Sequence, residues 1–425
     1  MTNNNNNGVL FSSELQEQIR NRFCNVDSDS FGSRIFFENS GGSLRLRSCV
    51  EKAIEVDAHP DCGGRPQKQA KIQENYVKQG YNDLYTMLGT SKGSIITCIS
   101  ATQVMFDIIN AITGSISGKN IVVSSLEHPS AFDSVQYYAN LHNLELRILQ
   151  SNPSTGSIEN SEVERLVDEN TVLLSCMYAS NVTGAVNDIP SIAKIARNIK
   201  PSIYIVIDAV QHMPHDIVDI DALDIDALNF APYKYFGLRG SGIGWVSPRC
   251  AILPHNRILG FSKETWELGS TAPHIFANFS EIFNHVAWIG EKFTKSKNRR
   301  ELFINGMKQI KLHERALLFH ALEGVGGLPG LREINGVRVH CDSLPLSKRH
   351  FVLPITFDNI DSYSAVKEYI NRGIHVFERK SSDYYSNRII RSLGLNSLIR
   401  ISPIHCNSLN EIYKFLQVSQ EIARL

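Results

Sequence analysis

The chain carries no excess charge of either sign, since its 425 residues include 43 Lys and Arg and 43 Asp and Glu. A protein that binds nucleic acid or an anionic membrane over a broad surface needs a basic excess, so we predict neither partner. Long apolar runs are also lacking, because none approaches the roughly 18 residues that a membrane-spanning helix requires. The N-terminus continues from Met1 into an Asn-rich tail (3–7) and lacks the basic and apolar regions of a signal peptide. A cytosolic location is therefore expected.

Cysteine pairs are missing as well. The eight cysteines are scattered, and no two of them form a Cys-x-x-Cys motif. Such spacing fits reduced thiols better than a disulfide framework. His59 and Cys62 could suggest zinc, but no second pair of ligands accompanies them, so we predict no metal site. Residues 342–399 contain no cysteine at all.

The size of the chain is sufficient for a large domain and a smaller one. Hydrophobic residues make up 42% and charged residues 20% of the sequence, which is ordinary for a globular protein. We predict a tail and a short helix over residues 1–25, and a large domain over residues 26–290. Connecting helices and a smaller α+β domain follow over residues 291–425, with the glycine-rich segment 324–330 at the entry to the smaller domain.

Buried strands and helices alternate through the first half of the chain. Alternation of this kind predicts an α/β protein with a mostly parallel sheet and helices on both of its faces. The strands are expected at residues 94–99, 120–125, 144–149, 171–178 and 203–207, and the helices at 104–112, 160–169 and 189–199.

One stretch of the sequence suggests the chemistry. An apolar, β-branched strand (203–207) ends at Asp208, and Lys234 follows 26 residues later, shortly before a glycine-rich segment (240–244). Open α/β sheets bind ligands at the carboxyl ends of their parallel strands. A pyridoxal phosphate site needs a lysine that holds the aldehyde as a Schiff base and a carboxylate that keeps the ring nitrogen protonated. Taken singly, Asp208 could instead cap a helix and Lys234 could lie on the surface.

Two more strand ends carry residues suited to this cofactor. The strand at 94–99 enters an apolar helix through Ala101 and Thr102, and free backbone N–H groups at such a junction bind phosphate. The hydroxyl groups there could alternatively do no more than cap the helix. His128 follows the strand at 120–125, where its imidazole could lie over the pyridine ring and move protons, or could be an ordinary surface histidine.

Eight motifs, all in family order, resemble the class V aminotransferase family and especially its cysteine desulfurase-like branch. The resemblance extends from about residue 36 to the C-terminus. The motifs lie at residues 37–42 (FENSGG), 100–103 (SATQ), 127–130 (EHPS), 179–184 (ASNVTG), 208–215 (DAVQHMPH), 233–237 (YKYFG), 267–270 (ELGS) and 400–403 (RISP).

The resemblance implies a fold and a set of residue roles. The fold would be that of fold type I enzymes, with a mixed, mostly parallel seven-stranded sheet and a smaller α+β C-terminal domain. Lys234, His128 and Asp208 would be catalytic, and a homodimer would form in which Ser270 reaches the partner's phosphate. The residues expected to bind pyridoxal 5'-phosphate are Ala101, Thr102, His128, Asn181, Asp208, Gln211, Tyr233, Lys234 and Ser270, and those expected to bind substrate are Arg400, Asn39 and Gly41.

Departures from the family pattern qualify the activity. Ala231 and Tyr233 stand where the family usually has serine and histidine, and Ala101 stands where many members have threonine. The loop before Arg400 has no cysteine to accept sulfur, and Cys406 comes after that arginine.

We therefore expect an enzyme that works through a Lys234 aldimine and breaks a C–S bond by β-elimination, like a cysteine desulfurase without its catalytic cysteine. A class V aminotransferase or epimerase is the alternative on the same scaffold, and a catalytically inert scaffold protein is the alternative from another class.

Overall fold

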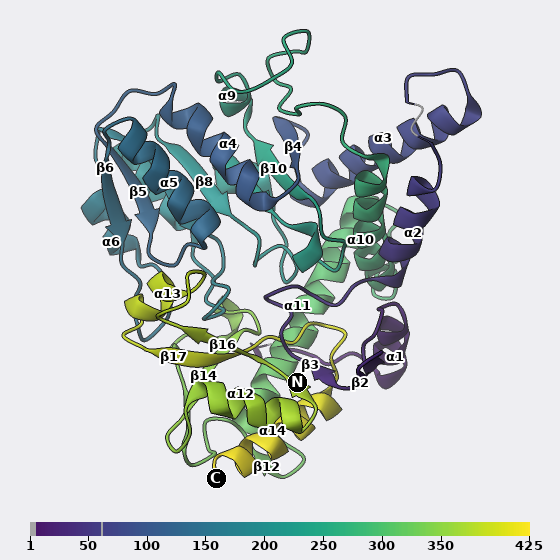
Figure 1. Cartoon of the computed structure of the whole chain (residues 1–425), viewed down its shortest axis with the longest axis vertical. Coiled ribbons are helices and arrows are strands. Elements are labelled where there is room, and N and C mark those ends of the chain that lie inside the picture. The colour runs from purple at the N-terminus through teal and green to yellow at the C-terminus, as the bar shows by residue number, and fades with distance from the viewer. Residues whose placement is uncertain (1–5, 61–62) are drawn as a thin grey trace.

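The computed structural model describes residues 6–60 and 63–425. Cys62 and most of the Asn-rich tail (residues 1–5) therefore lie outside the described residues. The chain forms a large part around one sheet and a C-terminal part below it, shown in yellow-green in Figure 1. Helix α11 (Arg299–Glu323) runs from one part to the other.

The large part is built on a seven-stranded sheet with the strand order β4-β10-β9-β8-β7-β5-β6. All of its strands are parallel except β10, which pairs antiparallel with both of its neighbours. This confirms the predicted α/β class with a mixed, mostly parallel sheet. The strands are β4 (Ser94–Cys98), β5 (Asn120–Ser124), β6 (Glu145–Leu149), β7 (Thr171–Met177), β8 (Tyr204–Asp208), β9 (Ala227–Phe230) and β10 (Gly242–Val246).

Helices cover both faces of this sheet because successive strand residues point to opposite sides. In β8, Ile205 packs into one core and Val206 into the other. Each fully buried side chain of this size stabilises the fold by about 1.5–3 kcal/mol. Helices α4 (Ala101–Thr113) and α5 (Pro129–Leu141) cover the Val206 face, and α6 (Asn160–Leu166), α7 (Ile189–Ile199) and α10 (Pro273–Glu291) cover the Ile205 face.

The other helices of the large part lie near α10 or in short connections. Helices α2 (Arg47–Asp57) and α3 (Lys68–Leu88) pack against α10, and α1 (Ser13–Asn21) contributes two residues to the same core. Two single-turn helices, α8 (Ile220–Leu223) and α9 (Pro248–Ala251), flank β9 and β10 in the sequence. Among the described helices, none has an apolar stretch long enough to cross a membrane.

The C-terminal part has its own antiparallel sheet, ordered β13-β14-β17-β16, and its own core. Its last helix, α14 (Leu409–Ile422), begins with a capping box in which Ser408 and Glu411 bond each other's backbone N–H groups. The remaining elements are β13 (Val337–Val339), β14 (Leu353–Phe357), β16 (Phe377–Lys380), β17 (Ser397–Ile401), α12 (Ser362–Asn371), α13 (Asn387–Ser392), η3 (Leu346–Lys348), β11 (Gly324–Val325) and β12 (Leu328–Pro329).

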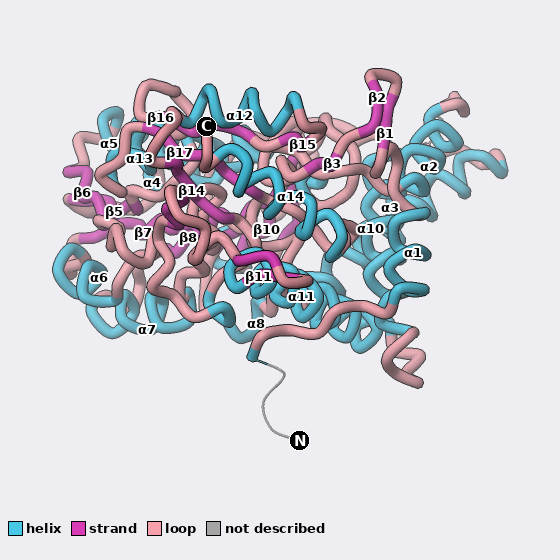
Figure 2. The backbone as a smooth tube through the Cα atoms, turned by 90° about the horizontal axis from the view of Figure 1, so that it is seen from below, coloured by secondary structure: helices cyan, strands magenta, loops and turns pink. Residues whose placement is uncertain are grey.

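An N-terminal segment crosses to the C-terminal part. After a short hairpin of β1 (Ser28–Asp29) and β2 (Gly32–Ser33), strand β3 (Ile35–Phe36) pairs in parallel with β15 (Ile374–His375), beside which it lies in Figure 2. Glu38 continues the contact through a bridge to Ser402. These residues fall in the interval predicted for the large domain, yet they pair with strands of the C-terminal part. The pairing brings Glu38 next to the end of β17.

Candidate active site

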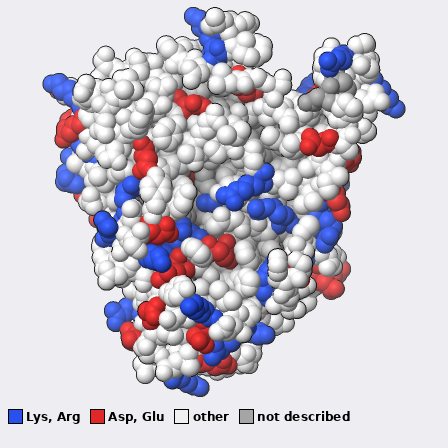
Figure 3. Space-filling view, in the orientation of Figure 1, with Lys and Arg blue, Asp and Glu red and all other residues white. Residues whose placement is uncertain are grey.

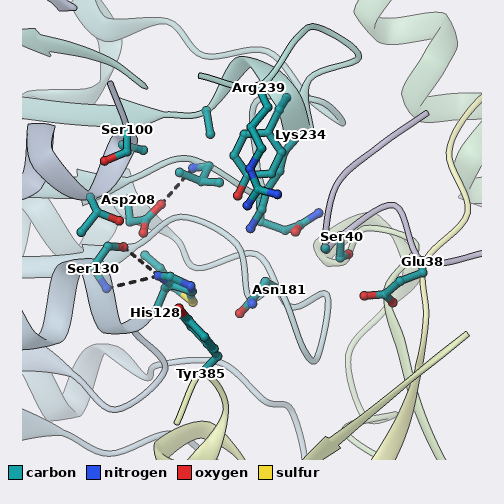
Figure 4. A pocket seen from close by; sticks show the side chains of 18 of the residues that line it. Glu38, Ser40, Ser100, His128, Ser130, Asn181, Asp208, Lys234, Arg239 and Tyr385 are labelled. Atoms are coloured by element: carbon teal, nitrogen blue, oxygen red, sulfur yellow. Dashed lines mark hydrogen bonds between the residues drawn. The ribbon is translucent and has the colours of Figure 1, made fainter. Parts of the chain in front are cut away.

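A cavity of about 450 Å³ opens at the carboxyl-terminal edge of the large sheet. The segments after β4, β5, β7, β8 and β9 all contribute to its lining, because the carboxyl ends of parallel strands meet at one edge of a sheet. β16 and β17 of the C-terminal part form the opposite wall. Figure 4 shows the side chains that line the cavity.

The turn from β4 into α4 presents backbone groups to the cavity. Ser100 caps the helix by accepting the N–H of Gln103 at 3.2 Å, and Ala101 and Thr102 form the first turn and line the cavity. N–H groups of a first turn have no partner within their own helix, so they are available to an anion. Strand β10 passes so close that a Cβ at Gly242 would lie 2.0 Å from the Ala101 nitrogen, which explains the glycine.

Asp208 is the last residue of β8 and is 3% exposed. Its Oδ1 accepts the N–H of Val210 at 3.0 Å. Burial raises the pKa of Asp208, while that hydrogen bond and the nearby Lys234 ammonium act in the opposite direction. Such a carboxyl group is placed to accept a hydrogen bond from a protonated ring nitrogen.

His128 caps helix α5 and remains neutral. Its Nδ1 accepts the N–H of Ser130 at 3.2 Å, so the ring proton of the neutral form lies on Nε2. Burial, followed by the positive charge of Lys234, lowers the pKa of His128 to about 3. The imidazole stacks against Tyr385 with 5.7 Å between ring centroids and 25° between ring planes. A neutral ring fixed in this way presents a flat face suited to stacking.

Two amide side chains reach the cavity with unused hydrogen-bonding capacity. Asn181 follows β7 and Gln211 follows β8. The Oδ1 of Asn181 and the Oε1 of Gln211 are buried and have no partner among the residues that the structure describes. A buried polar atom without a partner costs about 1–3 kcal/mol. A ligand that bonds both amides would recover this cost, and an amide can turn to present either its oxygen or its nitrogen.

Lys234 ends a short 3₁₀ helix, η2 (Pro232–Lys234), that follows β9. Burial, and after it the positive charge of Arg400, lowers the pKa of Lys234 to about 8, although Asp208 raises it. The loop beyond is strained, since Phe236 has a φ of 63° that a bulky residue rarely adopts. Ser43 holds this conformation by accepting the Phe236 N–H at 3.0 Å.

Arg400, the predicted ligand of a substrate carboxylate, already has partners. It lies on β17 and is 1% exposed. Its Nη1 donates to the backbone oxygen of Asn181 at 2.8 Å, and Glu38 accepts from both Nη2 and Nε, the latter at 3.4 Å. Gly41 leaves room for this pair, because a Cβ there would lie 2.6 Å from Glu38 Oε1. Sequence reasoning missed the role of Glu38.

Arg239, Arg379 and Tyr385 also line the cavity, and of these Arg239 was missed by the sequence reasoning. Arg379 lies on β16, where it shares a face with Phe377, and its Nε has no partner among the described residues. Its closest acid is Asp383 at 3.7 Å. Burial, then the charge of Arg400, lowers the pKa of Arg379 to about 10.

The structure therefore brings most of the predicted residues to one cavity but leaves two outside its lining. Asn39 is buried, where its Nδ2 donates to Ser402 O at 3.0 Å and its Oδ1 accepts the Leu44 N–H at 3.0 Å. Ser270 is exposed in an adjoining hollow that shares Ile99 and Gly240 with the cavity. The predicted residues that do line it are Gly41, Ala101, Thr102, His128, Asn181, Asp208, Gln211, Tyr233, Lys234 and Arg400.

These features fit pyridoxal phosphate. The helix turn suits a phosphate, and the two amides with unpartnered oxygens suit a ring oxygen once they turn to present their nitrogens. The carboxyl group suits a ring nitrogen, and the lysine with a lowered pKa suits an aldehyde. The seven-stranded sheet with this site at its edge defines the protein as an α/β enzyme of fold type I. The chain belongs to the class V aminotransferase family, whose sequence model matches residues 66–415.

Known proteins of similar sequence and structure agree with this assignment. The chain is 27% identical over 400 residues to a protein named probable cysteine desulfurase from Borreliella burgdorferi, with 90% of each chain covered. It is 22% identical over 413 residues to the aminotransferase-like protein FGM3 of Gibberella zeae, covering 93% of this chain and 95% of that one. The apo structure of a cysteine desulfurase from Thermococcus onnurineus superposes with a TM-score of 0.79 at 18% identity, covering 96% of this chain and 98% of that one, which supports the fold.

Proposed function

We propose that this protein uses pyridoxal phosphate to break a carbon–sulfur bond of a small amino acid by β-elimination. The observation that carries the proposal is the convergence on one cavity of Lys234, Asp208 and two amides whose oxygens have no partner among the described residues. Relatives of this chain are named cysteine desulfurase, and these names favour a sulfur-containing amino acid as its substrate.

The large sheet supplies the groups that would hold the cofactor. Ala101 and Thr102 would bind the phosphate through their N–H groups, and Asp208 would accept the ring N–H. Asn181 and Gln211 would bond the phenolic oxygen, while the face of His128 would lie against the ring. Tyr233 lines the cavity and would add a further contact to the cofactor. Its ring lies under the Arg239 guanidinium at 4.7 Å.

Bound pyridoxal phosphate supplies an electron sink that eases loss of a proton from the substrate α carbon. Lys234 Nζ is the group placed to take that proton. With a pKa of about 8, about a tenth of this amine is neutral at pH 7, against far less for an exposed lysine. His128 remains neutral, so its Nε2–H can donate a hydrogen bond.

The C-terminal part supplies positive charge for the substrate. Lys and Arg side chains gather near the middle of the face seen in Figure 3, and the C-terminal part contributes Arg379 and Arg400 to the cavity. Arg400 would bind the α-carboxylate with its planar fork once Glu38 gives way. Arg379, whose Nε has no partner among the described residues, would hold a second anionic group. The substrate class that follows is a cysteine, or a cysteine derivative with an acidic group on sulfur.

Sulfur would leave as a free product and would not be transferred to a cysteine thiol of the protein. No cysteine is among the described residues that line the cavity. Cys341 and Cys406 are buried, and burial raises the pKa of both thiols, which keeps them unreactive. Tyr385 occupies the cavity wall before Arg400. For cysteine the overall reaction would be cysteine plus water giving pyruvate, ammonia and hydrogen sulfide.

Product analysis tests this proposal. The full chain is loaded with pyridoxal phosphate and incubated with cysteine, cysteate (the sulfonate), S-methylcysteine or alanine, with and without a 2-oxo acid. We expect sulfide or sulfite, pyruvate and ammonia in equal amounts from the first two substrates, with no need for the oxo acid. Alanine formed without pyruvate would indicate desulfuration instead, and amino transfer to the oxo acid would indicate an aminotransferase. Absence of any bound cofactor would reject the enzyme.

We also propose a cytosolic homodimer in which Ser270 completes the neighbouring site. Its exposure in a hollow that adjoins the cavity supports this arrangement. Sedimentation analysis should give twice the chain mass. Mixing Lys234→Ala with Ser270→Trp chains should restore about a quarter of the activity if a site combines residues from two chains. No restored activity would contradict shared sites.

A further inference from the structure

A buried chain of hydrogen bonds leads from the cavity to helix α11. Gln211 Nε2 lies 3.1 Å from His215 Nε2, and His215 Nδ1 lies 2.7 Å from Glu314 Oε2. The second carboxylate oxygen, Oε1, accepts the backbone N–H of His405 at 2.9 Å. The three side chains of Gln211, His215 and Glu314 are at most 4% exposed. Only Gln211 lines the cavity, so the other two act on a ligand through it.

The pairing of His215 with Glu314 limits the forms that the imidazole can take. A buried carboxylate needs a donor, and the Nδ1–H of His215 is the side-chain donor that reaches it. The Nε2 on the other side of the ring then either carries a lone pair, in the neutral form, or a second proton, in the imidazolium form. The imidazolium form would be balanced by Glu314.

Other titratable groups near His215 are neutral or paired. His350 has its ring centroid 5.0 Å away, and its Nε2 bonds His212 Nδ1 at 3.1 Å. Burial lowers the pKa of His350, His212 and His405, so these rings remain neutral. The neighbouring Lys311 pairs with Asp216. Glu314 is therefore the acid that directly faces the His215 ring.

The form of His215 decides which end of the Gln211 amide faces the cavity. With a lone pair on Nε2, the amide N–H points to His215, and Oε1 is left without a partner, as the structure has it. With a proton on Nε2, the amide turns so that its oxygen accepts from His215 and its NH₂ points into the cavity. Only the second arrangement donates to an anionic ring oxygen.

We propose that His215, as an imidazolium paired with Glu314, is a positioning residue that turns the Gln211 amide to donate to the phenolic oxygen of the cofactor. The inference rests on the proposed function, because it assumes that pyridoxal phosphate occupies the cavity. Proton uptake at His215 accompanies the turn of the amide. No other covalent bond forms or breaks.

A double-mutant cycle on cofactor binding tests the proposal. The dissociation constant and the visible absorbance maximum of pyridoxal phosphate are measured for the wild type, Gln211→Ala, His215→Phe and the double variant. We expect His215→Phe to weaken binding about tenfold, the effect of one hydrogen bond, and to move the absorbance maximum. In the Gln211→Ala background the same substitution should change neither quantity. Equal effects in both backgrounds would show a merely structural role and overturn the inference.

Glu314→Gln removes the charge while keeping the shape of the partner. It should raise the dissociation constant of pyridoxal phosphate as much as His215→Phe does. This variant therefore provides the test if His215→Phe does not fold. An affinity equal to that of the wild type would overturn the proposal. His313→Phe is the matched control, since it alters an equally buried histidine of α11 that does not reach Gln211. A wild type that never binds pyridoxal phosphate would reject the proposed function itself. Normal binding that is indifferent to residues 215 and 314 would reject this inference alone.

Discussion

The two walls of the cavity differ in how their polar groups are held. On the wall of the large sheet, the amide oxygens of Asn181 and Gln211 are left without partners. On the wall of the C-terminal part, Arg400 uses Nη1, Nη2 and Nε in bonds to the protein itself. The two amide oxygens of the first wall are open to a ligand that stays, whereas Arg400 of the second wall keeps its protein partners until a ligand arrives. We infer that the first suits a resident cofactor and the second an exchanging substrate.

Lys234→Ala gives the largest expected effect and tests the wall of the large sheet. Loss of both the covalent link to the cofactor and the proton acceptor should lower kcat by at least about 10³-fold. The visible absorbance of the bound cofactor should disappear, while thermal stability should hold because a buried amine is removed. Steady-state rates, spectra and melting curves measure these outcomes.

The matched control for that experiment is Lys200→Ala, which alters a lysine at the end of α7 and away from the cavity. It should leave rate and spectrum unchanged. A Lys234→Ala protein that keeps the visible band would mean that the lysine does not hold the cofactor.

Arg400→Lys should give the next largest effect and acts on the opposite wall. A lysine keeps the charge but loses the planar fork, so the substrate carboxylate should lose one of two charge-assisted hydrogen bonds. We expect kcat/KM to fall by about 30- to 100-fold, while the affinity for pyridoxal phosphate stays within about twofold. A large loss of cofactor affinity would mean that the two walls are not functionally separate.

The same contrast between the walls explains how much of the site was predictable from the sequence. Asp208 and His128 follow recognisable buried strands, and strand order alone brings them to one edge. Glu38 meets Arg400 across 362 positions of the chain, through the pairing of β3 with β15. Nothing local in the sequence marks such a contact, because it depends on where a long N-terminal segment crosses the fold.

The fold was predictable where elements are long and regular, and less so where they are short. Strand β9 (Ala227–Phe230) was missed because it has only four residues and follows a run of aspartates. Helix α5 was missed although Pro129 stands at its first turn, a common helix start. Both elements lie next to segments that line the cavity.

Glu38→Gln should give a smaller effect. It tests whether the bonds between Arg400 and Glu38 compete with the substrate on the wall of the C-terminal part. Without its charge, residue 38 competes less with the substrate carboxylate for Arg400. We therefore expect KM to fall about threefold with little change in kcat, as measured by steady-state kinetics. Glu378→Gln is the matched control, because this residue neighbours Phe377 on β16 but does not line the cavity. A raised KM would indicate that Glu38 orients Arg400 and does not compete for it.

Glu127→Gln should give the smallest effect on activity, although residue 127 precedes His128 in the sequence. Burial, and then the charge of Asp208, raises the pKa of Glu127 to about 8, so the carboxyl group is protonated at pH 7 and resembles an amide. Its Oε1 accepts the hydroxyl of Ser124 at 2.6 Å, which a glutamine oxygen can also do. We expect kcat to change by less than about twofold.

The thermal stability of Glu127→Gln should nevertheless depend on pH differently from that of the wild type. A carboxyl group whose pKa is raised by folding stabilises the native state below its unfolded pKa, near 4.5, and that contribution is lost as pH rises through about 8. Glu127→Gln does not lose this contribution. The melting temperature of the variant minus that of the wild type should therefore increase between pH 5 and pH 9. A gap that stays constant over this range would mean that Glu127 is ionised in the folded protein, and the wall of the large sheet would then carry a second buried negative charge beside Asp208.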